Sequence, residues 1–447
     1  MSKCQFGITI LISYLFNVKS KEFNLTANDK IYDEYKKTNA ELNMPLNFEE
    51  LFSINAKRMK KSVIRELLKL TSKPEIISFA GGLPSPDSFP IKEVKEIVNE
   101  VLDNEGKAAL QYSATEGDPV LREQLLKHAS RNGMDVKGEN LLVTTSSQQG
   151  LDLTAKIFIN PGDPIIVELP SYVGGLGAFN AYGAEMIGVP LDEEGKSSIL
   201  LRQELKILNE SGNKPKFIYI VPDFQNPAGM TMSLRRRYEI LELAHEFNLI
   251  ILEDSPYREL RFEGEPVPTI YSLDKEGRVI LLGTFSKIFA PGFRIGWILA
   301  PPQVITKLVV AKQSTDLCPP KFSQRIIGRF MEKGYLEKNI EKIKHMYRRK
   351  RDIMLEEFEK HMPEGVTWTK PEGGLFLFLR VPAHMCIDTD ELFYKAVDKN
   401  VAYVIGSAFH CDDSGHDSMR INFSYATEDQ IVEGVKRLAA VIKEHIK

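Results

Sequence analysis

One lysine, Lys287, has neighbours that could make it a covalent binding group. It lies in the stretch Thr284–Trp297, which reads TFSKIFAPGFRIGW and follows an apolar run. A lysine amine forms a Schiff base with an aldehyde when burial or nearby cations lower its pKa. Thr284, Ser286 and Arg294 are residue types that bind a phosphate anion. An aldehyde with a phosphate describes pyridoxal phosphate (PLP), although a lysine in such a turn, taken alone, is more often an ordinary surface residue.

The elements that must position this lysine form an alternating pattern. Short apolar runs, each followed by a helical segment such as Gln149–Phe158 or Leu234–Phe247, begin near residue 141. Five runs are expected to be strands: Leu141–Thr144, Pro164–Val167, Phe217–Val221, Ile250–Glu253 and Val279–Leu282. Runs of this kind between helices predict an α/β domain with a largely parallel sheet, where ligands gather at the carboxyl ends of the strands.

Polar residues follow the first two predicted strands. Ser147 and Gln148 open a helix after the first strand, where free N–H groups and the helix dipole favour a phosphate. The alternative is a plain N-cap by Ser146 or Ser147. Tyr172 follows the second strand and could lie flat on a heteroaromatic ring, or simply pack in the core.

The next two strands end in an amide and a carboxylate. Asn226 could donate its amide N–H to a phenolate oxygen, although a polar residue before proline is usually only a turn. Asp254 could pair with a protonated ring nitrogen, the partner that PLP needs to act as an electron sink, or be a cap or surface charge. Each signal is weak alone. Their joint order along the chain favours one cofactor site.

Three candidates precede the sheet. Gly82 belongs to a Gly-Gly turn that lets the backbone approach a ligand closely, or that only turns the chain before a helix. Tyr112 is either a core tyrosine or a phosphate ligand. Arg65 lies at the start of the amphipathic segment Ser62–Leu70, where a solvated charge is the simpler interpretation.

Several blocks of this sequence resemble the class I/II aminotransferases of PLP fold type I. They include SQQG, the Asn-Pro pair after a strand, EDSPY and TFSKIFAPGFRIGW, in the order found in that family. The blocks SVIRELLKL, SFAGGLPSPDSFP, LQYSATEG and MRINFSYAT are most similar to its 2-aminoadipate and kynurenine (LysN-like) branch. The resemblance covers about residues 55–447. It implies a large domain with a mainly parallel sheet between helices and a smaller α+β domain.

The resemblance also implies roles for individual residues. The expected catalytic residues are Lys287, Asp254 and Tyr172. The expected PLP-binding residues are Lys287, Ser147, Gln148, Tyr172, Asn226, Asp254, Tyr257, Thr284, Ser286, Arg294 and, from the other subunit, Tyr112. The expected substrate-binding residues are Arg420, which would hold the α-carboxylate at two points, with Gly82, Asn226 and Arg65. In the aminoadipate branch the position of Arg65 meets an acidic substrate side chain.

The implied activity is a ping-pong transfer of an amino group from an α-amino acid to a 2-oxo acid, with 2-oxoglutarate as the expected acceptor. Aminoadipate, glutamate, aromatic and branched donors all fit. A PLP-dependent lyase or decarboxylase on the same fold is one alternative. A non-catalytic aminotransferase-like sensor is another, although no separate DNA-binding domain is visible before residue 55.

Length and composition bound the remaining expectations. The chain has 447 residues and a net charge of −3, which argues against nucleic acid as the main partner. Its four cysteines have no metal-ligand or redox spacing, so we expect a cytoplasmic protein with no metal site. Because no apolar run approaches bilayer length, we expect no membrane partner. The apolar run Gly7–Phe16 is too short to span a bilayer as a helix. The resemblance implies a homodimer with shared active sites.

The expected domains are an N-terminal extension at 1–50, an arm with part of the small domain at 51–108, a large PLP-binding domain at 109–320 and a small domain at 321–447. Val401–Ile405 is predicted to be one strand, and 335–361 a charged helix. The basic run Tyr347–Asp352 in it is typical of a solvated helix face.

Overall fold

The structure is a computed structural model that describes residues 46–61, 66 and 73–446. The chain divides into two units at Ser53 and Ile54. The first unit contributes the short helix α3 (Phe48–Leu51). The second unit begins with α4 (Ile54–Arg58) and contains the sheets and all the other helices given below. Residues 1–45 of the predicted extension lie outside the described residues, as do Arg65 and the rest of the predicted helix Ser62–Leu70 except Glu66. The domain boundaries set out above stay a prediction.

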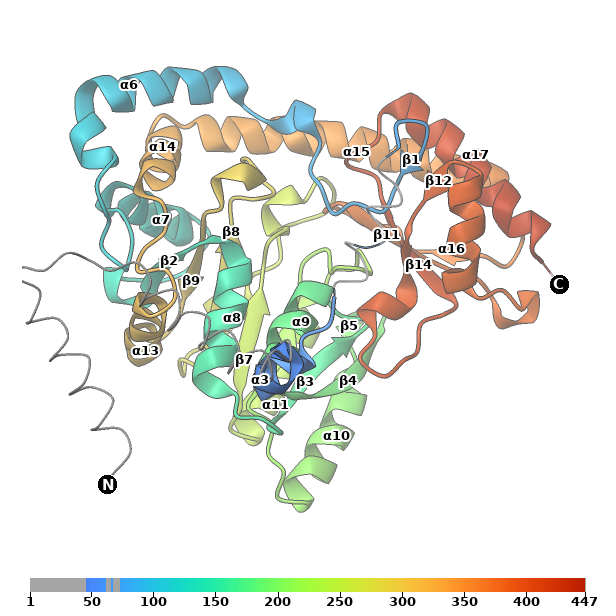
Figure 1. The fold of residues 1–447 in the computed structure, drawn as a ribbon, viewed down its shortest axis with the longest axis horizontal. Helices are drawn as coiled ribbons and strands as arrows, with labels where there is room; N and C mark the ends of the chain where they lie inside the picture. Colours follow the sequence, from blue (N-terminus) through green and yellow to red (C-terminus); the bar gives the residue numbers. More distant parts are fainter. Residues whose placement is uncertain (1–45, 62–65, 67–72, 447) are drawn as a thin grey trace, which may run out of the picture. The chain divides into compact units, whose positions relative to one another are not determined.

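An eight-stranded, mainly parallel sheet forms the centre of this unit, with the strand order β2-β9-β8-β7-β6-β3-β4-β5 (Figure 1). Its strands are β2 (Leu141–Thr144), β3 (Pro164–Leu169), β4 (Glu185–Asp192), β5 (Gly195–Lys196), β6 (Phe217–Ile220), β7 (Ile250–Asp254), β8 (Val279–Thr284) and β9 (Gly296–Leu299). All five predicted strands are present within two residues of the expected ends.

Alternate residues of the buried strands enter two separate cores, one on each face of the sheet. Phe217 and Tyr219 of β6 belong to the larger core, whereas Ile218 and Ile220 belong to the smaller one. The smaller core is completed by apolar residues of α10 (Ser198–Glu210), α11 (Leu234–Glu246) and α12 (Ile270–Leu273). Because both faces are covered by helices, these strands are apolar throughout rather than alternating.

The larger core lies on the other face. It includes residues of α8 (Ser146–Phe158), α9 (Val173–Ala181) and α13 (Pro302–Gln313). Further helices are α6 (Ile91–Ala109), α7 (Pro119–Arg131) and α14 (Lys321–Glu332), and α14 packs against both of the others.

The carboxyl ends of the five predicted strands lie at one edge of the sheet. The strands β3, β6, β7 and β8 pair in parallel. β9 pairs antiparallel with both β8 and β2, so β2 runs in the same direction as β8. The polar residues that follow these strands are therefore brought to the same edge, as the alternating pattern predicts.

A smaller antiparallel sheet has the order β10-β11-β14-β13, and a separate parallel pair joins β1 to β12. These strands are β1 (Ile77–Ser78), β10 (Thr367–Trp368), β11 (Phe376–Arg380), β12 (Val401–Ala402), β13 (Val404–Ile405) and β14 (Ser418–Asn422). The single strand predicted at 401–405 is therefore wrong. Tyr403 separates its two halves, which pair with different partners, and its hydroxyl donates to the Thr389 carbonyl at 2.6 Å.

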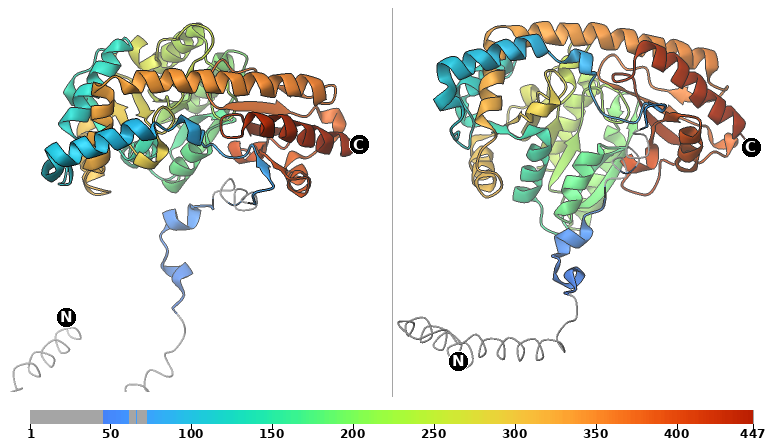
Figure 2. Two further views of the ribbon diagram at one scale, coloured as in Figure 1. Left: turned by 90° about the horizontal axis from the view of Figure 1, so that it is seen from above. Right: turned by 45° about the horizontal axis from the view of Figure 1, so that its top comes forward.

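The remaining helices are α15 (Tyr335–His361), α16 (Thr389–Asp398) and α17 (Glu428–Glu444). Figure 2 shows the length of α15, which packs against α14 and α17. The basic run in α15 is only half solvated: Lys350 and Arg351 are buried and donate to the carbonyls of Ser424 and Pro371. No helix among the described residues is long and apolar enough to cross a membrane.

Candidate active site

The first turn of α8 has the groups that could bind an anion. Ser146, its first residue, has a left-handed φ of 62°, and the Arg294 guanidinium donates to its hydroxyl. A Cβ added to Gly296 would lie 2.6 Å from the carbonyl carbon of Ser146 and 2.7 Å from the nitrogen of Ser147. Only glycine therefore lets β9 come this close to the free N–H groups of the helix.

Two hydroxyls adjoin the same place. Thr284 pairs with Gly296 across β8 and β9, and its hydroxyl donates to that of Ser286 at 3.0 Å. With Arg294 they provide two hydroxyls and a guanidinium beside a helix N-terminus, the groups that bind a phosphate. The plain N-cap considered for Ser146 or Ser147 is wrong, because Thr145 occupies the cap and makes no side-chain cap bond.

Lys287 lies in the turn after β8, with its amine inside the site. Nζ donates to the Gly82 carbonyl at 2.8 Å. Burial, followed by the neighbouring charges of Arg420 and Arg294, lowers the pKa of Lys287 to about 8. A larger fraction of this amine is therefore neutral near neutral pH than in an ordinary lysine, as a nucleophile or general base requires.

Asp254 ends β7 with a carboxylate that is only half used. The Tyr219 hydroxyl donates to Oδ2 at 3.0 Å, whereas Oδ1 is buried and has no hydrogen-bond partner among the described residues. Burial raises the pKa of Asp254 to about 7, against the opposing effect of the Tyr219 hydrogen bond. A buried carboxylate oxygen without a donor is costly, so this geometry fits a group that brings its own N–H.

Asn226 and Tyr257 lie on a third side. The Asn226 amide donates to the Tyr257 hydroxyl at 3.1 Å, and Arg420 Nη1 donates to Asn226 Oδ1 at 2.9 Å. That bond fixes the orientation of the amide with its N–H₂ facing the phenol. Burial raises the pKa of Tyr257, so its hydroxyl stays protonated and can donate in turn to an oxygen anion.

Arg420 of β14 is a buried guanidinium beside the amine. Its plane lies over the rings of Phe376 and Phe409, with centroids 4.3 and 5.1 Å from Cζ. Burial lowers its pKa to about 10. Nη2 donates to the Ala80 carbonyl at 2.8 Å, and Nε has no partner among the described residues. A desolvated guanidinium binds a carboxylate strongly.

Gly82 separates this guanidinium from Lys287. A Cβ at Gly82 would lie 3.8 Å from Arg420 Nη2, and the carbonyl of the same residue accepts from the lysine amine. The predicted carboxylate-binding and amine groups are thus brought together by one glycine.

Tyr172 and Gln148 form the wall between the two ends. The Tyr172 hydroxyl donates to Gln148 Oε1 at 3.3 Å, and Gln148 Nε2 donates to the Gly174 carbonyl at 2.8 Å. A Cβ at Gly174 would lie 2.5 Å from the Tyr172 ring, so glycine leaves the space that the phenol occupies. The partly buried ring can lie against a planar ligand.

Tyr112 is not brought to this group within the described part of the chain. Its side chain is 77% exposed, beside Leu110 at 70%. The carbonyl of Tyr112 accepts from Lys321 Nζ at 3.5 Å.

The arrangement matches PLP group by group. It offers a phosphate-binding helix end, an amine of lowered pKa, a carboxylate oxygen without a donor and a phenol-amide pair for a ring oxygen. The sequence model of the family described as aminotransferase class I and II matches residues 74–438. The chain belongs to this family. It is accordingly a PLP-dependent transaminase of PLP fold type I.

Known aminotransferases are similar to this chain over most of its length. An aromatic-amino-acid aminotransferase of Thermococcus litoralis is 50% identical, and the matched region covers 90% of this chain and 96% of the relative's length. The solved kynurenine aminotransferase of Pyrococcus horikoshii is 48% identical with a TM-score of 0.86, covering 90% and 99%. The solved α-aminoadipate aminotransferase of Thermus thermophilus is 36% identical with a TM-score of 0.82, covering 89% and 99%.

Sequence reasoning missed some residues of this aminotransferase site. Tyr219 lies inside an apolar strand, where nothing in the pattern distinguishes a functional phenol from a core residue. The buried ions Glu168 and Lys196 were also missed. Glu168 stands in the otherwise apolar strand β3, a signal that could have marked it, whereas Lys196 belongs to the two-residue strand β5 with Gly195 and carries no such signal.

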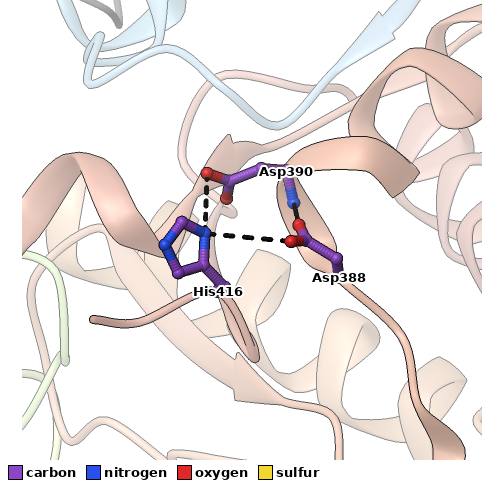
Figure 3. Close-up of side chains that lie close together, drawn as sticks. All are labelled: Asp388, Asp390 and His416. Atoms are coloured by element: carbon purple, nitrogen blue, oxygen red, sulfur yellow. Dashed lines mark hydrogen bonds and ion pairs between the residues drawn. The ribbon is translucent and has the colours of Figure 1, made fainter. Parts of the chain in front are cut away.

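A second group of ligand-type side chains, Asp388, Asp390 and His416, lies at the start of α16 and just before β14 (Figure 3). His416 Nδ1 is 3.1 Å from Asp390 Oδ2, and Nε2 is 3.0 Å from the Asp413 carbonyl. Two acceptors favour the doubly protonated ring. Partial burial opposes this charge, but Asp390 and Asp388 outweigh it and raise the pKa of His416. An imidazolium has no lone pair for a metal, so the geometry favours an ion-pair cluster.

Proposed function

We propose that this aminotransferase moves the amino group of an α-amino acid to 2-oxoglutarate or a similar 2-oxo acid by a ping-pong mechanism. The donor would be 2-aminoadipate, glutamate, or an aromatic or branched amino acid. The convergence of the Lys287 amine and the Arg420 guanidinium at Gly82 carries the proposal, because both substrates have a carboxylate next to the reacting carbon. The names of the relatives support the aromatic and aminoadipate donors.

Three side chains would do the chemistry. Arg420 would bind the substrate carboxylate and orient the bond between the α-carbon and its hydrogen. The neutral Lys287 amine would take the proton from the α-carbon and return it one position away, as base and then acid. Asp254 Oδ1 would accept the ring N–H and keep that proton in place. PLP, when bound, supplies the electron sink for the charge left on the α-carbon.

The remaining residues would position the cofactor. The backbone of Ser147 and Gln148, with Thr284, Ser286 and Arg294, would bind its phosphate. Asn226 and Tyr257 would donate to its ring oxygen, and Tyr172 would lie against its ring.

Replacing Arg420 by lysine is expected to lower kcat/KM about 100-fold for the amino donor and for the oxo acceptor alike. A lysine cannot make the two-point contact that a guanidinium makes with a carboxylate. Steady-state kinetics with each substrate varied in turn measure the effect, with PLP affinity expected to stay within about threefold. Arg351→Lys is the matched control, since Arg351 is also buried and stacked on a ring, that of Phe262. Equal losses in both variants would contradict the role of Arg420.

Arg65 is proposed to recognise acidic donor side chains, on the resemblance alone, since it lies outside the described residues. Arg65→Ala is expected to lower kcat/KM about tenfold for 2-aminoadipate and glutamate, and less for leucine or phenylalanine, because only the acidic donors lose an ion pair. A panel of amino acids assayed with 2-oxoglutarate measures this and also identifies the preferred donor. Equal losses across the panel would remove Arg65 from recognition.

We also propose a homodimer with shared active sites, in which Tyr112 reaches the phosphate bound by its partner. The exposure of Tyr112 and Leu110 supports this, because large side chains gain by burial in an interface. A monomer in sedimentation equilibrium would contradict it.

We place the protein in the cytoplasm, where its described cysteines, Cys318, Cys386 and Cys411, would stay free. Recovery in an exported fraction would contradict that location.

A further inference from the structure

Tyr219 is the one side chain, among the described residues, that donates a hydrogen bond to Asp254. It lies on β6, next to the strand that carries Asp254, and its hydroxyl is 3.0 Å from Oδ2. With Oδ2 held in this way, the other oxygen of the carboxylate has no hydrogen-bond partner in the described part of the chain. The phenol therefore determines which oxygen is available to a bound ring.

The Tyr219 ring has little freedom to move. It is fully buried, and Phe179 meets it edge to face with centroids 5.1 Å apart. On another side, a Cβ added to Gly175 would lie 3.0 Å from Cζ and 3.1 Å from Oη. A glycine in α9 thus leaves the space that the phenol needs to reach the carboxylate. Packing of this kind fixes the orientation of a hydrogen-bond donor in advance.

Few charged or titratable side chains of the described residues surround this phenol. Asp254 on β7, Glu168 on β3 and Tyr172 before α9 face it. Lys196 on β5 donates to the Tyr219 carbonyl at 3.2 Å, on the backbone side. Burial first, and then Asp254, raise the pKa of Tyr219 well above its usual range. The phenol is therefore a donor at every working pH.

We propose that Tyr219 is a positioning residue of the aminotransferase, whose hydroxyl aims Asp254 Oδ1 at the ring nitrogen of PLP and keeps that carboxylate ionised. The inference rests on the proposed role of Asp254. A hydrogen bond to a carboxylate favours its charged form, whereas burial favours the neutral acid. Without the hydroxyl, burial dominates, and a neutral acid cannot hold a proton on the ring nitrogen.

The test compares Tyr219→Phe with Tyr403→Phe. Tyr403, between β12 and β13, is an equally buried phenol whose hydroxyl donates to the Thr389 carbonyl. The affinity of each cofactor-free protein for PLP is measured by absorbance titration between pH 6.5 and 9, together with its melting temperature. Tyr219→Phe is expected to weaken PLP binding about tenfold, since hydrogen bonds to charged groups have about this effect.

The pH profile separates positioning from packing. In Tyr219→Phe the pH at which the absorbance of bound PLP changes is expected to move upward, with KM for the amino donor within about twofold and kcat reduced. Tyr403→Phe is expected to match the wild type in all of these. Wild-type PLP affinity and an unchanged pH profile in Tyr219→Phe would overturn the inference.

Two further variants keep the result decisive. Gly175→Ala pushes on the same phenol without removing it, and is expected to shift the pH profile in the same direction even if Tyr219→Phe fails to fold. An unshifted profile in Gly175→Ala would then overturn the inference. Asp254→Asn separates the two levels of the proposal. If it weakens PLP binding and Tyr219→Phe does not, only the role of Tyr219 fails; if neither does, the role of Asp254 fails.

Discussion

Lys287→Ala is expected to lose at least about 10⁴-fold in kcat and to show no visible absorbance band of covalently held PLP. The variant removes both the amine that the cofactor aldehyde needs and the group that moves the α-proton, and general acid-base catalysis alone contributes up to about this factor. The lowered pKa of the amine, about 8, is what suits it to both tasks. Stopped assays with 2-oxoglutarate and an absorbance spectrum of the purified protein measure the two losses.

Lys350→Ala is the control for this variant. Lys350 is also buried, but its amine donates to the Ser424 carbonyl at 2.9 Å rather than to a residue of the candidate site. It is expected to lose stability and to keep its absorbance band. Turnover near the wild-type rate in Lys287→Ala would contradict the assignment of the amine.

The second large effect is expected from Asp254→Asn, with a loss of about 10³-fold in kcat. Asparagine keeps the shape of the side chain but not the charge that holds a proton on the ring nitrogen, and removal of one preorganised electrostatic group costs about this much. The loss is expected in kcat rather than in KM, because no contact with the amino acid changes. Single-turnover kinetics with a saturating donor measure it directly.

Glu253→Gln is the matched control. Glu253 is the preceding residue of β7, its pKa is likewise raised to about 7 by burial, and it accepts from the backbone nitrogens of Ile270 and Tyr271. Its side chain thus lies on the other face of the sheet from Asp254. An equal loss of kcat in both variants would show that any buried carboxylate of β7 matters, and would contradict the proposed contact.

Asp254→Asn is expected to lower kcat but not the stability of the cofactor-free protein at alkaline pH. Folding raises the pKa of the Asp254 carboxyl to about 7. Its contribution to folded-state stability is therefore lost as the pH rises from the pKa of the unfolded chain to the folded pKa of about 7. Above pH 7 the cofactor-free wild type therefore contains an unfavourable buried charge that Asp254→Asn lacks. Thermal unfolding of the two cofactor-free proteins at pH 8 should show the variant at least as stable.

Much of this fold was predictable because the sheet is buried on both faces. Short, continuous apolar runs such as Val279–Leu282 are typical of strands covered by helices on both sides, and their polar ends mark one edge of a parallel sheet. The order of Asn226, Asp254 and Lys287 after successive strands then determined most of the site. The division of Val401–Ile405 into two short strands could not be predicted in this way. The two halves pair with different strands, and an apolar run looks the same whether or not its pairing changes.

The residues near the candidate site that were not predicted contact segments distant in sequence. Tyr219 lies in an otherwise apolar run, and only the folded structure places its hydroxyl 3.0 Å from Asp254 Oδ2. Ser146 differs from its neighbour Ser147 by a left-handed φ that no local composition requires. In both cases the role depends on a contact between segments distant in sequence, which spacing along one segment cannot show.

The central claim is that PLP is held covalently by the amine of Lys287. The most direct measurement is to reduce the PLP-loaded protein with borohydride, digest it and locate the phosphopyridoxyl label by mass spectrometry. The account predicts one label per chain, on Lys287. A label on any other lysine, or none with turnover intact, would contradict it.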